Sequence, residues 1–198
     1  MRKIILASTS RYRRQLLQQL QIPFETAPPR FEEVMDDSVA PALLVRHLAL
    51  GKAQSLASDY PDALIIGSDQ VFVDQRGRIL GKPLDYHNAE QQLRQMAGRS
   101  HCFYTGIALY DSRTGSATTD YATMNVTLRP LSNTQISDYL QRETPFDCAG
   151  SFKVEGLGIA LIETLEGEDY TALIGLPLIK LVTLLQQADV AILGASDS

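Results

Sequence analysis

Hydroxyl and cationic side chains cluster in the segment 6–14, Leu-Ala-Ser-Thr-Ser-Arg-Tyr-Arg-Arg, at a predicted junction of a strand and a helix. Ser8 and Ser10 precede the helix, and Ser10 is a favourable N-cap residue. Three arginines occupy the first turn, where the helix dipole already contributes partial positive charge. Hydroxyls, guanidinium groups and free backbone N–H groups together predict a seat for a phosphate chain. The alternative interpretation is a solvated basic helix start.

A second candidate, Asp69, lies inside an apolar run. Leu-Ile-Ile precedes its Gly-Ser-Asp-Gln motif and Val-Phe-Val follows it. Because side chains alternate between the two faces of a strand, and both faces here are largely apolar, we expect this strand to be buried. A buried carboxylate costs several kcal/mol unless a cation or hydrogen bonds compensate it. We interpret Asp69 as a metal ligand or general base, with an architectural salt bridge as the alternative.

Three further charged residues could complete such a site. Glu33 follows a Pro-Pro loop and could provide a second carboxylate beside Asp69, because Mg²⁺ is usually held by one or two carboxylates plus substrate phosphates. Lys52 follows Leu44 and Leu48 at spacings of four and therefore shares an apolar helix face, from which it could reach an anion or simply extend to solvent. Lys82, between a glycine and a proline, is a candidate phosphate contact.

The segment 150–158 contains three glycines and an alternating Lys153/Glu155 pair. It could form a pocket wall, with Lys153 on phosphate and Glu155 on a base edge, or be an ordinary loop that enters a strand. The histidines show no shared spacing, and Cys148 has no evident base beside it, so neither residue type predicts a catalytic site.

Composition limits the class of protein. The chain has 198 residues, 44% of them hydrophobic, and a formal net charge of −5. An acidic chain argues against a general nucleic-acid binder, and no apolar run approaches the ~18 residues needed to span a membrane. The start of the chain lacks the long apolar stretch of a signal peptide, and the two cysteines form no disulfide framework. These features predict a cytoplasmic protein that binds a small anionic ligand.

Hydrophobic periodicity, caps and turn residues predict alternating strands and helices. Strands are expected at 3–7, 23–27, 63–74, 79–80, 101–111, 117–130 and 158–165. Helices are expected at 11–20, 40–58, 87–97, 132–142, after a Ser-x-x-Gln capping box, and 177–188, with Pro177 in the first turn. The pattern predicts a mixed α/β fold, with a frayed tail at 194–198.

These stretches together resemble the Maf family of nucleoside triphosphate pyrophosphatases. The matching segments lie in the family's order along nearly the whole chain: 6–10 with Arg13 and Arg14, Glu33, 52–53, 67–70, 81–83, 104–106, 149–151 and 175–177. The resemblance implies one domain over 1–198, with a mixed twisted sheet and flanking helices as in inosine triphosphatases, and two lobes around a nucleotide cleft. It also implies a divalent metal cofactor, Mg²⁺ or Mn²⁺, a homodimer, a cytoplasmic location and a nucleotide substrate, with neither nucleic acid nor membrane as partner.

The implied reaction converts a nucleoside triphosphate to the monophosphate and pyrophosphate. By resemblance, Asp69 is the proton acceptor, and Glu33 joins it in holding the metal. The family's phosphate-binding positions correspond to Ser8, Arg13, Arg14, Lys52 and Lys82.

Two positions bear on the substrate. The commoner branch of the family, which resembles dTTP/UTP pyrophosphatases, has Arg in place of Tyr12 and Gln in place of Glu155. Tyr12 and Glu155, with Ser-Phe-Lys at 151–153, look like the 7-methyl-GTP pyrophosphatase branch, and Gln70 is the third expected specificity residue. Hydrolysis of pyrimidine or other non-canonical nucleotides, and a nucleotide-sensing role in regulating septum formation, are the alternatives.

Overall fold

The computed structural model describes residues 2–36 and 38–194 of the chain. They form two compact units. Unit 1 comprises Met1–Gln70, Thr105–Ala122 and Asp169–Ser198, and unit 2 comprises Val71–Tyr104 and Thr123–Glu168. Three strands contribute residues to both units, and the single domain expected over 1–198 stays a prediction. The tail that we expected to be frayed lies almost wholly outside the described residues.

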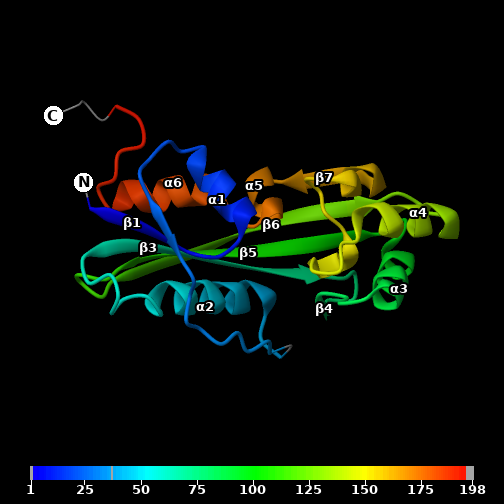
Figure 1. Ribbon diagram of the computed structural model, residues 1–198, viewed down its shortest axis with the longest axis horizontal. Coiled ribbons are helices and arrows are strands. Elements are labelled where there is room, and N and C mark those ends of the chain that lie inside the picture. The colour runs from blue at the N-terminus through cyan, green and yellow to red at the C-terminus, as the bar shows by residue number, and fades with distance from the viewer. Residues whose placement is uncertain (1, 37, 195–198) are drawn as a thin grey trace. The chain divides into compact units, whose positions relative to one another are not determined.

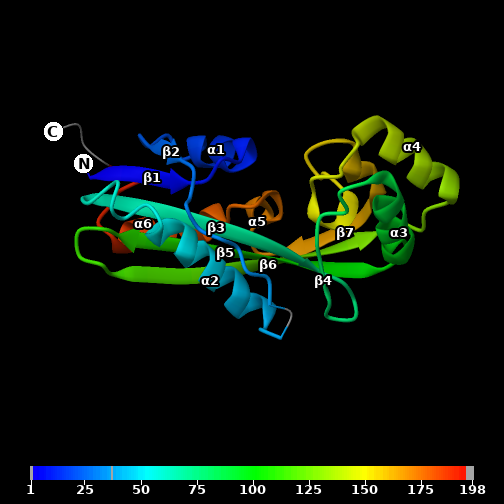
Figure 2. The same cartoon turned by 60° about the horizontal axis from the view of Figure 1, so that its bottom comes forward.

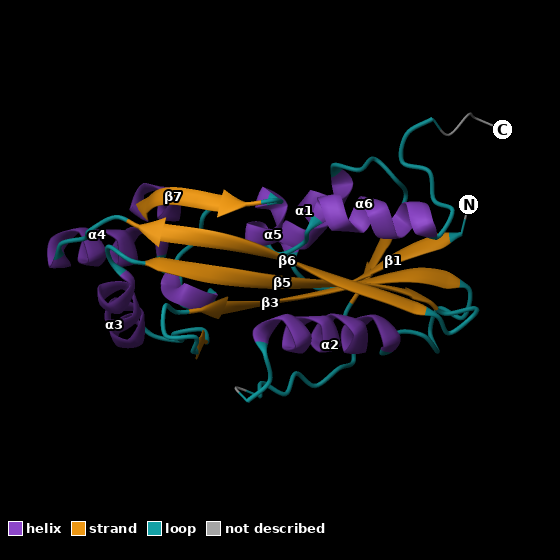
Figure 3. Ribbon diagram, turned by 180° about the vertical axis from the view of Figure 1, so that it is seen from behind, coloured by secondary structure: helices purple, strands orange, loops and turns teal. Residues whose placement is uncertain are grey.

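A mixed seven-stranded sheet forms the framework, with strand order β2-β1-β3-β5-β6-β7 and β4 paired to β3 (Figure 3). Its strands are β1 (Lys3–Ala7), β2 (Glu25–Ala27), β3 (Ala63–Val73), β4 (Ile79–Leu80), β5 (Ser100–Asp111), β6 (Ala117–Leu128) and β7 (Ile162–Gly167). β1 is parallel to β2 and β3, whereas β4 is antiparallel to β3 and β7 to β6. The predicted mixed α/β class is confirmed.

Helices flank the strands of each unit. Unit 1 has α1 (Arg11–Gln18), α2 (Pro41–Gln54), α5 (Tyr170–Ile174) and α6 (Leu178–Gln187), and unit 2 has α3 (Tyr86–Met96) and α4 (Asn133–Glu143). In unit 1, α2 covers one face of the strands, and α1 and α6 cover the other (Figure 1). In unit 2, α3 and α4 pack side by side (Figure 2).

The alternation of β1 explains how it divides the core of unit 1 between the two faces. Ile4 and Leu6 join a cluster formed with leucines of α1 and α6. Ile5 and Ala7 join a second cluster that includes Ala53, near the end of α2. A strand covered on both faces must be apolar on both, and β3 follows the same rule, with all of its residues except Gln70 buried. The burial predicted for this strand is confirmed.

Several local predictions are confirmed in detail. The Ser10 side chain accepts a hydrogen bond from the backbone N–H of Arg13 at the start of α1. Ser132 and Gln135 form the expected capping box of α4. The helix predicted at 87–97 is α3, Tyr86–Met96, and Gly98 shortly after it has φ 67°, the left-handed backbone that favours glycine at that place.

Other boundaries were wrong. The strand predicted at 158–165 is a 3-10 helix, Leu157–Leu161, followed by β7. Gly158 lies so close to the Lys153 carbonyl that a Cβ would be 2.3 Å from its oxygen, so this segment turns back on itself. The short helix α5 was not predicted, the helix expected at 40–58 ends at Gln54, and Pro177 is the N-cap of α6, not its first residue.

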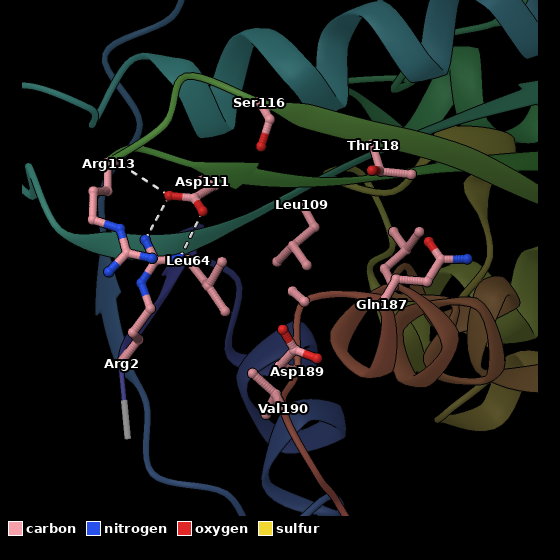
Figure 4. Close-up of a pocket in the computed structure, with 12 residues that line it drawn as sticks. Arg2, Leu64, Leu109, Asp111, Arg113, Ser116, Thr118, Gln187, Asp189 and Val190 are labelled. Carbon is pink, nitrogen blue, oxygen red and sulfur yellow. Dashed lines mark hydrogen bonds and ion pairs between the residues drawn. The ribbon is translucent and has the colours of Figure 1, made fainter.

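A bidentate ion pair ties the start of β1 to the end of β5. Arg2 donates from Nη1 to Asp111 Oδ2 at 2.7 Å and from Nη2 to Asp111 Oδ1 at 2.5 Å. It lies in a hollow of about 530 Å³, which also has Arg113 and Asp189 on its wall (Figure 4). None of the predicted site residues lines this hollow. The hydrogen bonds from Arg2 hold the pKa of Asp111 well below its usual range.

We therefore expect Asp111→Asn to lower the free energy of unfolding at pH 7 by about 1.5–3 kcal/mol, the scale of hydrogen bonds to charged groups. A carboxyl group with a lowered native pKa contributes stability above its unfolded pKa, and that contribution is lost as pH falls. The difference between variant and wild type, measured by urea unfolding, should thus shrink below about pH 4. Asp138→Asn, which removes an exposed pair with Arg142, is the control and should change stability little. Equal effects of the two variants would contradict this account.

Candidate active site

Two glycines allow α2 to approach the sheet of unit 1 closely. A Cβ on Gly67 of β3 would lie 2.0 Å from the carbonyl oxygen of Ala49, and a Cβ on Gly106 of β5 would lie 2.2 Å from that of Val45. No side chain fits at either position without displacing helix backbone. The close approach brings the end of α2, which carries Lys52, over the middle of β3, which carries Asp69.

Lys52 lies between two carboxylates. Its Nζ is 2.5 Å from Oδ1 of Asp69 and 2.7 Å from Oε1 of Glu33. Lys52 and Asp69 are each 5% exposed, whereas the Glu33 side chain is 49% exposed. The prediction that Lys52 shares the apolar helix face is confirmed, and its ammonium group meets anions there and does not extend to solvent. The second oxygen of Asp69, Oδ2, has no hydrogen-bond partner among the described residues.

Burial and nearby positive charge shift the pKa of Asp69 in opposite directions. Loss of solvent raises the pKa of its carboxyl group, and this effect outweighs the nearby positive charges of Lys52 and Arg13. Burial likewise lowers the pKa of Arg13, against the attraction of Asp69 and Glu33. Arginine nevertheless remains charged in proteins. Unit 1 therefore holds two cations and two carboxylates within electrostatic reach of each other, and Asp69 binds a proton more readily than an ordinary aspartate.

The basic start of α1 separates into inward and outward groups. Arg13 turns inward and donates from Nε to the carbonyl oxygen of Gly175 at 2.8 Å. Arg14 is exposed, and Arg11 lies over the ring of Tyr12, with Cζ 4.6 Å from the ring centroid. Ser8 is buried, and its Oγ accepts from the backbone N–H of Ser10 at 3.1 Å. Of the three arginines in this turn, Arg13 is thus the one that interacts electrostatically with the Asp69 carboxylate.

A polar network that the sequence did not reveal fixes the neighbours of Asp69. The Oγ of Ser68 lies 2.8 and 2.9 Å from the carbonyl oxygens of Gly106 and Gly175, which share its single hydroxyl proton. The amide nitrogen of Gln70 is 3.0 Å from Thr105 Oγ1 and 2.7 Å from the carbonyl oxygen of Ala172 in α5. Gly175 therefore receives both Ser68 and Arg13, which anchors β3 and α1 to the same loop. The only sequence signal for this arrangement was the presence of glycine at 106 and 175.

The other two predicted site residues, Lys82 and Glu155, belong to unit 2. Both are exposed. Lys153, expected on phosphate, forms an ion pair with Asp147 at 3.3 Å. Glu155 directly precedes the glycine that leads into the 3-10 helix. The roles expected for these residues stay predictions.

The donor set fits a divalent metal that arrives with phosphate. Asp69 and Glu33 contact the same ammonium group, so their oxygens converge on one region, and Oδ2 of Asp69 is unengaged among the described residues. The described residues contain no cluster of three or more His, Cys, Asp or Glu side chains that could hold a metal by themselves. Mg²⁺ commonly uses one or two carboxylates and completes its shell with substrate phosphates and water, which matches this arrangement.

Comparison with known proteins identifies the fold and the family of the chain. The solved structure of the Ham1 protein from Staphylococcus aureus matches with a TM-score of 0.51, covering 94% of this chain and 99% of that one at 11% identity. At that identity the likeness concerns the fold alone. Residues 3–188 match the family of Maf-like proteins, and the chain belongs to this family.

Two relatives share the full length. A protein named 7-methyl-GTP pyrophosphatase from Syntrophotalea carbinolica is 61% identical over 194 residues, which cover 98% of each chain. A protein of the same name from Albidiferax ferrireducens is 46% identical over 194 residues, which cover 98% of this chain and 97% of its own.

The helices of the described residues were also compared with the length and hydrophobicity that a membrane span requires, and none of them meets both.

The close approach of α2 to β3 can be tested at Gly67. Gly67→Ala should lower the free energy of unfolding by about 1–3 kcal/mol, the range for overpacking, because the added methyl group overlaps the Ala49 carbonyl. Gly81→Ala is the matched control: a Cβ there meets nothing within 4 Å, and the change should be neutral or slightly stabilising. Chemical denaturation measures both, and a Gly67→Ala protein as stable as the control would show that α2 is not held by this contact.

Proposed function

We propose that this protein is a nucleoside triphosphate pyrophosphatase that hydrolyses 7-methyl-GTP to 7-methyl-GMP and pyrophosphate. The observation that carries the proposal is the buried Asp69 carboxylate of raised pKa, held by Lys52 and within the field of Arg13. Membership of the Maf-like family and the names of the two full-length relatives support the same activity. A homodimer in the cytoplasm is part of the proposal and rests on the family resemblance.

The chemistry follows from the placement of these groups. A water oxygen forms a bond to the α-phosphorus, and the bond from that phosphorus to the bridging oxygen breaks. The electron pair of the broken bond leaves with pyrophosphate, and Asp69 accepts the proton of the water. A carboxyl group with a raised pKa suits this role, because a base is most effective when its pKa approaches the working pH.

Cations stabilise the charge that develops on the phosphate oxygens. Lys52 and Arg13 are pre-positioned by Asp69 and Gly175, so they need little rearrangement when charge develops. Ser8, Arg14 and Lys82 are proposed as further phosphate contacts. A divalent cation bound by Asp69, Glu33 and the substrate would add charge neutralisation at the same oxygens.

The methylated base calls for an aromatic ring and a carboxylate. N7-methylation makes guanine a cation, which is attracted to an aromatic face by about 0.5–2 kcal/mol. Tyr12 lies between Arg11 and Arg13 in the first turn of α1 and is our candidate ring; in this structure Arg11 lies over it, so the base would replace one cation by another. Gln70, with its amide nitrogen engaged on α5, offers Oε1 as a further acceptor.

Glu155 is the proposed carboxylate. Guanine presents its N1–H and N2–H₂ donors side by side, and one carboxylate can accept from both in a charge-assisted pair. A glutamine at this position could accept only through its single carbonyl oxygen, which would weaken the discrimination.

The proposal is tested by incubating the purified chain with 7-methyl-GTP, GTP, dTTP and UTP, with separate assays for pyrophosphate and orthophosphate. We expect pyrophosphate release that is fastest for 7-methyl-GTP, abolished by EDTA and restored by Mg²⁺ or Mn²⁺. Preference for dTTP or UTP would place the chain with pyrimidine-specific enzymes. Nucleotide binding without turnover would favour a sensing role. Full activity in metal-free buffer would refute the requirement for a divalent metal.

Asp69→Asn should reduce kcat by at least ~10²-fold, the lower end of general-base contributions. Asp69 must be ionised to act as a base, and burial raises its pKa. As pH is lowered, wild-type activity should therefore begin to fall at a pH above the ordinary carboxyl range. The residual activity of the variant should not show this decrease. Circular dichroism should show a folded protein, since the change keeps the volume and removes a buried charge. Asp120→Asn, at a half-buried pair with Lys180, is the control and should keep its activity. A near-normal kcat for Asp69→Asn would require another base.

Substrate preference should depend on Tyr12 and Glu155. Tyr12→Arg places a cation against a cationic base, and Glu155→Gln removes the charged acceptor; each should lower the ratio of kcat/KM for 7-methyl-GTP over GTP. Glu163→Gln removes an exposed carboxylate of β7 and should leave the ratio unchanged. If all three variants keep the wild-type ratio, the base is recognised by other residues.

A further inference from the structure

A buried carboxylate in unit 1 takes no part in the chemistry described so far. Asp169 directly precedes α5 and is 3% exposed. It forms no ion pair with a lysine, arginine or histidine among the described residues. A buried carboxylate without a cation is costly unless hydrogen bonds compensate its charge. The position of Asp169 therefore calls for an explanation.

The starts of two helices supply the compensation. Oδ1 of Asp169 accepts from the backbone N–H and the hydroxyl group of Thr171, at 2.9 and 2.5 Å, and Oδ2 accepts from the backbone N–H of Ile179 at 2.8 Å. Thr171 Oγ1 accepts in turn from the backbone N–H of Leu178 at 2.8 Å. Pro177 precedes α6 and provides no side-chain cap of its own. Asp169 thus caps α5 and α6 together, at helix ends where the dipole favours a negative charge.

The segment between these two helix starts carries a carbonyl group of the candidate active site. The carbonyl oxygen of Gly175 lies 2.8 Å from Nε of Arg13 and 2.9 Å from Oγ of Ser68. Both ends of the segment 170–178 are fastened to the Asp169 carboxylate, one directly and one through Thr171. A shift of either helix start would therefore move the carbonyl group that holds Arg13.

The backbone of Gly175 fixes the direction of this carbonyl group. Its φ is 115°, a value that residues with a side chain rarely adopt, and a Cβ there would lie 3.4 Å from Nε of Arg13. Its N–H donates to the carbonyl oxygens of Thr171 and Ala172, at 3.2 and 3.0 Å, which closes α5. The Gly175 carbonyl therefore points where the end of α5 and the start of α6 direct it.

The guanidinium group of Arg13 is left ready for an anion. Its Nε–H is used on Gly175, whereas Nη1 and Nη2 have no hydrogen bond to a described residue. The planar guanidinium group presents its donors in a fixed geometry, so the contact at Nε sets the direction of the other two nitrogens. The carbonyl of Gly175 thus decides where Arg13 can meet a phosphate oxygen.

We propose that Asp169 is a positioning residue for the pyrophosphatase reaction. By capping α5 and α6 together it fixes the Gly175 carbonyl, and that carbonyl aims the guanidinium group of Arg13 at the substrate's phosphate chain. The inference rests on the proposed function, which supplies the phosphate that Arg13 contacts. Asp169 itself does not touch the substrate. A displacement of about 1 Å in a group that acts on the reaction can cost about 10²-fold in rate, so a distant cap can control turnover.

The first test measures hydrolysis of 7-methyl-GTP by Asp169→Asn. Asparagine has one acceptor oxygen and presents N–H donors in place of the other, so one helix start loses its partner. We expect kcat/KM to fall at least ~10-fold. Asp74→Asn is the matched control: the Asp74 side chain is 8% exposed and accepts from backbone N–H groups of a turn in unit 2. It should change kcat/KM less than about twofold.

A milder variant covers the case in which Asp169→Asn does not fold, as judged by circular dichroism. Thr171→Val keeps the shape of the side chain and removes only the hydroxyl link between the Asp169 carboxylate and the N–H of Leu178. It should lower kcat/KM in the same direction. Wild-type kcat/KM in Thr171→Val and in a folded Asp169→Asn would overturn the proposal.

A double-mutant comparison separates positioning of Arg13 from general support of the fold. If Asp169 acts through Arg13, Asp169→Asn should cost less than about twofold in the residual kcat/KM of Arg13→Ala, because the two changes remove one contact. The full tenfold loss in that background would show that Asp169 acts by another route, and would overturn the proposal.

The position of Arg13 is also measured without turnover. The ¹⁵N NMR signal of its Nε–H is assigned by its absence in Arg13→Ala. Because this hydrogen is held on the Gly175 carbonyl, its exchange with water should be faster in Asp169→Asn than in the wild type and unchanged in Asp74→Asn. Unchanged exchange in Asp169→Asn would contradict the inference. A wild-type chain that hydrolyses no nucleoside triphosphate would refute the proposed function and this role with it, whereas failure of the inference alone is seen in an active wild type.

Discussion

The ion cluster of Lys52, Asp69 and Glu33 is the constraint on which the candidate active site depends. Removing a carboxylate and an ammonium group from water costs several kcal/mol for each ion, and only close contact between opposite charges offsets that cost. Lys52 can reach Asp69 because Gly67 and Gly106 let the backbone of α2 lie directly on β3 and β5. Contact between Lys52 and Asp69 therefore requires three features together: the two glycines, the apolar faces of β3 and the position of Lys52 on its helix.

The cluster also explains why one aspartate can serve as a base. Burial alone would keep Asp69 protonated, and two adjacent cations alone would make it a weak base. With both influences present, its pKa is raised above the ordinary aspartate value although Lys52 and Arg13 lie nearby. The neighbouring Ser68 and Gln70 are fixed by carbonyl groups of the 172–175 segment, so the strand that carries Asp69 is held at both sides of the residue.

The sequence predicted the features that depend on local pattern. Alternation along 63–73 indicated a buried strand, a spacing of four indicated an inward Lys52, and Ser10 and Ser132 indicated helix starts. It did not predict contacts between distant segments, such as Arg13 with Gly175 or Gln70 with α5, because their partners are backbone carbonyls, which every residue possesses. The start of the strand predicted at 158–165 was wrong for a related reason. Gly158 packs against the backbone of Lys153, a contact that the apolar pattern of the segment does not reveal.

The two units use arginine in different ways. In unit 1, Arg13 is inward and lies in the field of two carboxylates, so the cluster is close to neutral before a substrate arrives. In unit 2, Arg76 and Arg99 are exposed and have no ion pair with any described residue. A neutral cluster suits catalysis on a substrate that brings its own metal.

The central claim is that Lys52 and Asp69 are coupled as a buried pair, and a double-mutant cycle on the free energy of unfolding measures this most directly. Lys52→Leu, Asp69→Asn and the double variant would be unfolded in urea at pH 7. We predict a coupling energy of about 1–3 kcal/mol, with Lys52→Leu the more destabilising single change because it leaves a carboxylate buried without its cation. A coupling energy near zero would contradict the account.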